Sequence, residues 1–173
     1  MVSAGGVANG VTGFSAGGVA GAGQLYAAGI YDLPEDTALV IKTTSPVEAH
    51  YIGFQLSNIW FEGPDQQNYV SSLTAGQLPP AKDGVRYYII AKDGPGVRGW
   101  VDTTGYNFGS FTMRFSFKDV PQADAMPTAE AQLVPYSELS KVLPDNLEKV
   151  SPQQRQQEIA VRQKAIKLRW RNY

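Results

Sequence analysis

The stretch from Val85 to Phe117 limits what this chain can fold into more than any other part of the sequence. Its first segment, 85–91, is rich in β-forming residues, and its last, 111–117, alternates apolar with polar side chains. Such alternation over a short run is typical of a strand with one buried and one solvated face. Between them, glycines on both sides of Pro95 predict a sharp turn. We therefore expect two strands joined by turns that carry aromatic and charged side chains.

Composition excludes several kinds of site and partner. The 173 residues, of which 43% are hydrophobic, suffice for one well-packed core and favour a single domain with appendages. A net charge of -1 lacks the basic surface that general nucleic-acid binding requires. The absence of cysteine excludes thiolate sites, and the single histidine, His50, excludes multi-histidine metal sites. We expect no metal, no cofactor, no nucleic-acid partner and no membrane span.

The first 29 residues differ from the rest of the chain. They contain 9 of its 18 glycines and no charged residue, and the hexapeptide Ser3–Ala8 recurs as Ser15–Ala20. Because glycine disfavours regular structure, residues 1–29 are predicted to be an extended or disordered leader, or a connection to another domain of a longer protein. No basic segment follows Met1, as a signal peptide would require, so a cytoplasmic location is favoured although the compartment stays open.

Residues 30–145 have the rhythm of short strands and turns. No amphipathic helix interrupts them before residue 135, which favours an antiparallel, jelly-roll-like sandwich in a mainly β fold over a parallel α/β sheet. In the segment 48–56, the even positions place His50 on the more apolar face. The predicted strands are 38–44, 48–56, 68–73, 85–91, 97–102 and 111–117, with an edge strand at 129–134 and a short helix at 136–143.

Residues 146–173 are predicted to hold a basic C-terminal helix. Ser151, Pro152 and Gln154 form an N-cap, a first-turn proline and a capping box. One side of this helix would carry an apolar stripe of Ile159, Ile166, Trp170 and Tyr173. Two interpretations stay open. The helix either braces its own domain, or it docks on a second copy of the chain or on another partner protein.

Several motifs resemble the C-terminal β-domain of the domain-of-unknown-function family 1214. They are the segments 33–41, 51–56 with Trp60, 93–105 and 150–155, in this order along the chain. The resemblance covers most of the chain after about residue 25. It implies a jelly-roll-like sandwich of a bacterial-type protein, often appended to another N-terminal region, with no established activity.

The first functional hypothesis is a non-catalytic binding or assembly module. Aromatic rings and an arginine near the turns would stack on a sugar-like or planar ligand and hold a carboxylate. Structural packing explains the tryptophans equally well. The candidate ligand-binding residues are Trp60, Asp93, Arg98, Trp100, Asp102 and Tyr106.

The alternative is a hydrolase-like enzyme, or an accessory domain of one. Asp93 and Asp102 would form its acid and base pair at the rim, assisted by His50. Both aspartates also stand in sequences that are ordinary for turns. If the two carboxylates lie at opposite ends of the fold, this hypothesis fails.

Overall fold

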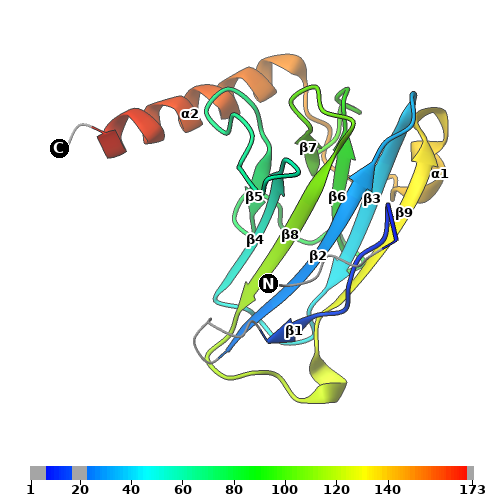
Figure 1. Cartoon of the computed structure of the whole chain (residues 1–173), viewed down its shortest axis with the longest axis vertical. Coiled ribbons are helices and arrows are strands. Elements are labelled where there is room, and N and C mark those ends of the chain that lie inside the picture. Colours follow the sequence, from blue (N-terminus) through cyan, green and yellow to red (C-terminus); the bar gives the residue numbers. More distant parts are fainter. Residues whose placement is uncertain (1–6, 17–22, 171–173) are drawn as a thin grey trace.

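The computed structural model describes residues 7–16 and 23–170, and it is mainly β with a C-terminal helix, as predicted (Figure 1). Two sheets face each other. The first has the order β1 (Ser15–Ala16), β2 (Gln24–Asp32), β8 (Phe108–Ser116), β4 (Tyr51–Ser57) and β5 (Ser72–Thr74). The second has the order β7 (Trp100–Asp102), β6 (Arg86–Ala91), β3 (Thr37–Thr44) and β9 (Thr128–Pro135). All neighbouring strands are antiparallel except β6 and β7.

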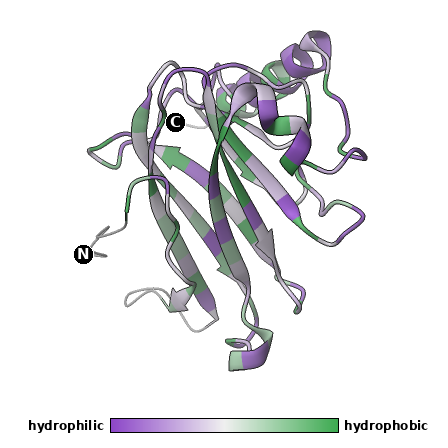
Figure 2. Cartoon of the chain, turned by 90° about the vertical axis from the view of Figure 1, so that its right-hand side faces the viewer, coloured by the Kyte–Doolittle hydropathy of each residue, from purple (hydrophilic) through white to green (hydrophobic). Residues whose placement is uncertain are grey.

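The core lies between the two sheets. The alternation in β8 is realised as predicted, because Phe111, Met113 and Phe115 are fully buried while Arg114 is exposed. Figure 2 shows hydrophobic and hydrophilic residues following one another along the strands. The phenyl ring of Phe54 in β4 stacks on Tyr88 in β6, with ring centroids 4.3 Å apart, and so joins the two sheets. Burial of apolar faces from both sheets in one cluster is the main source of stability for such a fold.

The position of strand β2 corrects the prediction that residues 1–29 form a leader outside the sandwich. This strand lies between β1 and β8, so the boundary expected at residue 29 falls inside a strand of the sheet. Gly29 is there for close packing, because a Cβ at this position would meet the Gly10 carbonyl oxygen at 2.2 Å and the Phe111 ring at 2.4 Å. Residues 1–6 and 17–22, with most of the repeated hexapeptide, lie outside the described residues.

Shorter elements complete the chain. Strand β9 is the predicted edge strand and pairs with β3. The predicted helix 136–143 is a 3-10 turn, η2 (Tyr136–Glu138), followed by α1 (Leu139–Val142). Another 3-10 turn, η1 (Ala123–Ala125), precedes β9. Among the described residues, no helix is both long and apolar enough to cross a lipid bilayer.

The C-terminal helix α2 (Pro152–Trp170) begins with the predicted capping box. The backbone N–H of Gln154 donates to Ser151 Oγ at 3.2 Å, and the backbone N–H of Ser151 donates to Gln154 Oε1 at 2.8 Å. The helix starts at one end of the sandwich and extends beyond the edge of the five-stranded sheet (Figure 1). Ile159, from the apolar stripe proposed for a partner, packs against the protein's own core. Tyr173 and the side chain of Trp170 lie outside the described part of the chain.

Candidate functional site

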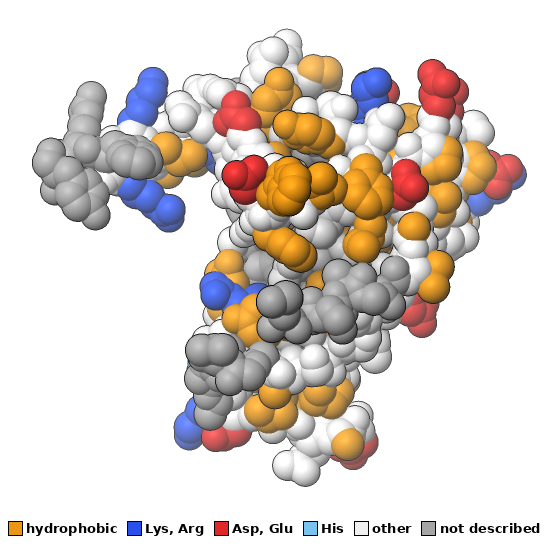
Figure 3. All heavy atoms as spheres, in the orientation of Figure 1, with side chains coloured by type: hydrophobic (Ala, Val, Ile, Leu, Met, Phe, Trp, Pro, Cys, Tyr) orange, Lys and Arg blue, Asp and Glu red, His pale blue; other side chains and the backbone are white. Residues whose placement is uncertain are grey.

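Strand register brings several of the predicted site residues to one end of the sandwich, here called the rim. Strands β2, β4, β6 and β7 end there, whereas β3 and β8 begin there. Trp60 follows β4, and Tyr106 precedes β8. Asp93 follows β6, and Asp102 is the last residue of β7. The rim carries exposed hydrophobic side chains, including Trp60 and Tyr106, which are 75% and 52% exposed. Figure 3 shows hydrophobic side chains gathered at the upper end of the face that it displays.

Two other predicted residues, Arg98 and Trp100, hold the terminal helix. Arg98 donates to Glu148 (Nε to Oε2, 2.5 Å) and to Glu158 of α2 (Nη1 to Oε1, 3.0 Å). The indole N–H of Trp100 donates to the carbonyl of Ala91 at 2.9 Å. The guanidinium of Arg155 lies 4.5 Å from the centroid of the Trp100 ring. We call Arg98, Trp100, Glu148, Arg155 and Glu158 the helix-docking corner, since each contributes to fixing the C-terminal segment.

The two aspartates of the enzyme hypothesis lie at the same end but in different settings. Asp102 is half-buried, and its Oδ1 accepts the backbone N–H of Thr104 at 2.8 Å. Burial raises the pKa of Asp102, while this hydrogen bond and the charge of Arg155 act in the opposite direction. Asp93 is exposed, and its backbone carbonyl accepts the hydroxyl of Tyr136 at 3.0 Å. Asp102 is thus used in a turn.

His50 does not join these carboxylates. It lies just before β4, at the end of the sandwich opposite to the rim, and it is exposed. The prediction of an apolar face for His50 is wrong because the strand begins only at Tyr51, so the alternation of β4 does not reach residue 50. In the described part of the chain, no three acidic or histidine side chains are grouped so that they could hold a metal ion.

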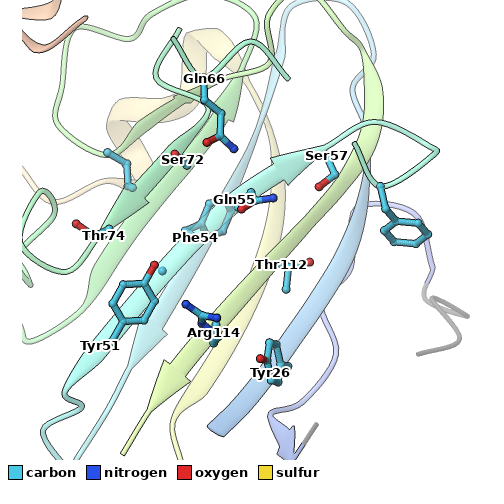
Figure 4. Close-up of a pocket in the computed structure, with 13 residues that line it drawn as sticks. Tyr26, Tyr51, Phe54, Gln55, Ser57, Gln66, Ser72, Thr74, Thr112 and Arg114 are labelled. Atoms are coloured by element: carbon cyan, nitrogen blue, oxygen red, sulfur yellow. The ribbon is translucent and has the colours of Figure 1, made fainter. Parts of the chain in front are cut away.

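A separate pocket of about 450 Å³ lies on the outer face of the five-stranded sheet (Figure 4). We call it the open-face pocket. Register places Tyr26, Arg114, Gly53 and Thr74 side by side on β2, β8, β4 and β5. The next row along the sheet contains Thr112, Gln55 and Ser72. Tyr51 flanks the first row, and Phe61 and Gln66 line the pocket from the loop between β4 and β5.

The absence of a side chain at Gly53 shapes the centre of this pocket. A Cβ there would meet the Tyr51 hydroxyl at 2.5 Å and its ring at 2.9 Å, so the ring lies across the position that a side chain would fill. Arg114 faces this gap from β8, and its guanidinium lies 4.9 Å from the centroid of the Tyr51 ring. The pocket thus presents an aromatic ring beside a cation on a rigid sheet.

None of the six candidate residues from the sequence lines the open-face pocket. Part of the signal was present, because alternation in 111–117 puts Arg114 on the solvated face, and alternation in 48–56 groups Tyr51, Gly53 and Gln55. The missing information was the pairing of β4 with β8, and the existence of β2, which contributes Tyr26.

No protein-family model matches the chain, and no curated protein matches it. Among solved structures, the chain is similar to an uncharacterised protein from Burkholderia cenocepacia, with 26% sequence identity and a TM-score of 0.60. The similarity covers 68% of this chain and 31% of that one, so the chain matches about a third of the length of its structural neighbour. The class defined by the structure is a β-rich, sandwich-like domain with a C-terminal helix, and the neighbour adds no activity to it.

Proposed function

We propose that this chain is a non-catalytic binding domain whose open-face pocket holds a sugar-like ligand. The observation that carries this proposal is the arrangement of Tyr26, Tyr51 and Arg114 on one solvated sheet face, with amide and hydroxyl side chains in the adjacent row. Tyrosine rings supply flat contact area, and the polar side chains supply hydrogen bonds to a ligand rich in hydroxyl groups. The volume is within the range of small-ligand sites.

The chemistry of the lining favours binding over catalysis. Among the residues that the structure describes, no Asp, Glu or His lines the open-face pocket, and these are the side chains that most often serve as general acids and bases. Glycoside hydrolysis in most enzymes requires a pair of carboxyl groups beside the bond that breaks. At the rim, Asp93 and Asp102 lie outside this pocket, and Asp102 is occupied by the turn at Thr104.

The test fills the gap at Gly53. The substitution Gly53→Val should displace the Tyr51 ring at little cost in stability, since a valine suits a strand and the clash is with the end of one side chain. In calorimetric titrations with cellotriose, chitotriose and trigalacturonate, the native chain should bind at least one of the three sugars. Gly53→Val should lower the affinity for that sugar about tenfold. Gly76→Val, at a position with open space around it, is the matched control and should leave binding unchanged. Absence of binding to all three, or equal binding by both variants, would contradict the proposal.

We also propose that the sheets form a jelly-roll-like sandwich and that the chain is a divergent member of the domain-of-unknown-function family 1214. The successive strands β2, β3 and β4 alternate between the two sheets, as jelly rolls require, and this supports the first proposal. The order of the motifs from 33–41 to 150–155 supports the second. A crystal structure of a family member should show the same strand order, including the parallel pair β6 and β7. A different order would contradict the family assignment, and a crystal structure of this chain with another order of strands would contradict the jelly-roll-like sandwich.

A further inference from the structure

We propose that Arg114 makes the open-face pocket selective for a sugar that carries a carboxylate, such as a uronic acid. This inference rests on the proposed binding function and adds the ligand class to it. Among the described residues, Arg114 is the only charged residue that lines the pocket, and no acidic side chain lines it. A guanidinium without a carboxylate neighbour in a ligand pocket favours an anionic group on the ligand.

Arg114 differs from Arg98, Arg155 and Arg162 in having no hydrogen-bond or ion-pair partner among the described residues. Within residues 7–16 and 23–170, no hydrogen bond or ion pair involves its guanidinium, whereas Arg98, Arg155 and Arg162 each donate to acids, hydroxyls or carbonyls. The ring of Tyr51 restrains the guanidinium through a cation–π contact at 4.9 Å. Such a contact uses the face of the guanidinium and leaves its N–H edge for a carboxylate, which it matches with two parallel hydrogen bonds.

The surroundings of Arg114 suit a sugar ring that bears this carboxylate. Tyr26 is directly opposite Arg114 on β2, and its hydroxyl donates to Gln24 Oε1 at 2.9 Å, which restrains its ring. Among the described residues, the side-chain amides of Gln55 and Gln66 make no hydrogen bond of their own. They are therefore available to the hydroxyl groups of a ligand that lies between the tyrosines.

A carboxylate fits this pocket better than a phosphate. Phosphate sites gather several backbone N–H groups at a loop or helix N-terminus, often with more than one cation. Here the backbone of β4 and β8 is used in strand pairing, and among the described residues that line the pocket only Arg114 carries a charge. A single guanidinium is planar and carries one charge, so it matches a planar anion of one charge, such as the carboxylate of a uronic acid.

The experiment compares trigalacturonate with its methyl ester, which keeps the sugar rings and removes the charge. By calorimetry, the native chain should bind the acid form about tenfold more tightly than the ester, as expected for one charge-assisted pair. Arg114→Gln should reduce binding of the acid form to that of the ester and leave ester binding unchanged. Arg169→Gln, which removes an exposed charge from α2, is the matched control.

The outcomes separate the two proposals. Equal binding of acid and ester by the native chain, or an unchanged preference in Arg114→Gln, would overturn the carboxylate inference while the binding function stands. Failure of both forms to bind would overturn the inference, and failure of cellotriose and chitotriose as well would overturn the binding function. Arg114→Gln should unfold near the native temperature, because Arg114 is exposed and has no hydrogen-bond or ion-pair partner among the described residues, and such a result would assign its effect to recognition.

Discussion

The helix-docking corner and the open-face pocket each contain an arginine beside an aromatic ring, but the two arginines differ in burial and in their other contacts. In the corner, Arg155 lies 4.5 Å from the Trp100 ring, and on the open face Arg114 lies 4.9 Å from the Tyr51 ring. The side chain of Arg155 is 14% exposed, and it also donates to Glu158 and to the carbonyl of Trp100. Arg114 is exposed and has no such acceptor within the described part of the chain.

This difference indicates how to separate structural from functional arginines. Burial lowers the pKa of Arg155, and the neighbouring charges of Glu158 and Asp102 offset part of this effect, so acidic side chains of the protein itself accompany this cation. The charge of Arg114 is balanced by no described neighbour, and a ligand can do so. An aromatic ring beside an arginine is therefore weak evidence for a site until the acceptors around the arginine are known.

The largest expected effect is a loss of stability when the helix-docking corner is altered, with no effect on binding at the open-face pocket. Trp100→Ala should lower the free energy of unfolding by about 3 kcal/mol, because the indole packs against a buried cluster and supports Arg155. Urea denaturation followed by circular dichroism measures this change. Trigalacturonate binding by the folded protein should be unchanged. A stable Trp100→Ala variant that has lost binding would place the site in the corner.

A smaller effect concerns pH. The pKa of Asp102 is raised in the folded state, so the carboxyl contributes its full stability below the unfolded value of 3.8 and loses it as pH rises through the folded value. Asp102→Asn keeps the oxygen that accepts the Thr104 N–H. The variant should be more stable than the native chain at pH 7, and this difference should disappear below pH 3.8. Denaturation curves at several pH values test the prediction, and a variant that is less stable at pH 7 would mean that the Arg155 charge outweighs burial.

The smallest effect is expected at the rim. Trp60→Ala should change the free energy of unfolding by no more than about 0.5 kcal/mol, because the side chain is 75% exposed. It should also leave trigalacturonate binding unchanged, since Trp60 does not line the open-face pocket. The same denaturation and calorimetry experiments measure both quantities. A strong loss of binding would extend the site from the open face onto the rim.

Much of the fold could be predicted from local patterns. The alternation in 111–117 and the β-rich run 85–91 correspond to β8 and β6, and the Ser151-Pro152 cap marks the start of α2. Strand β2 could not be recognised in this way, because two of its four inward positions are the small residues Ala27 and Gly29, which interrupt the apolar alternation between Leu25 and Tyr31. Its small residues are explained by close packing, which depends on contacts distant in sequence.

The candidate site was harder to predict than the fold. Tryptophans and aspartates near turns attract attention because they are rare or chemically active, yet Trp100 and Asp102 are used for packing and turn formation. The open-face pocket depends on the register that sets Gly53 opposite Arg114, and this register cannot be predicted from the sequence of either strand alone. Only the pairing shows that a glycine, a tyrosine and an arginine from different segments form one surface.

The most direct test of this account is a map of amide chemical-shift changes by NMR during titration with trigalacturonate. The account predicts that the changes concentrate around Tyr26, Gly53 and Arg114, on the four strands that line the open-face pocket. The amides of residues 98–104 should not move. Changes centred on Trp100 and Asp102, with the open face unaffected, would contradict it.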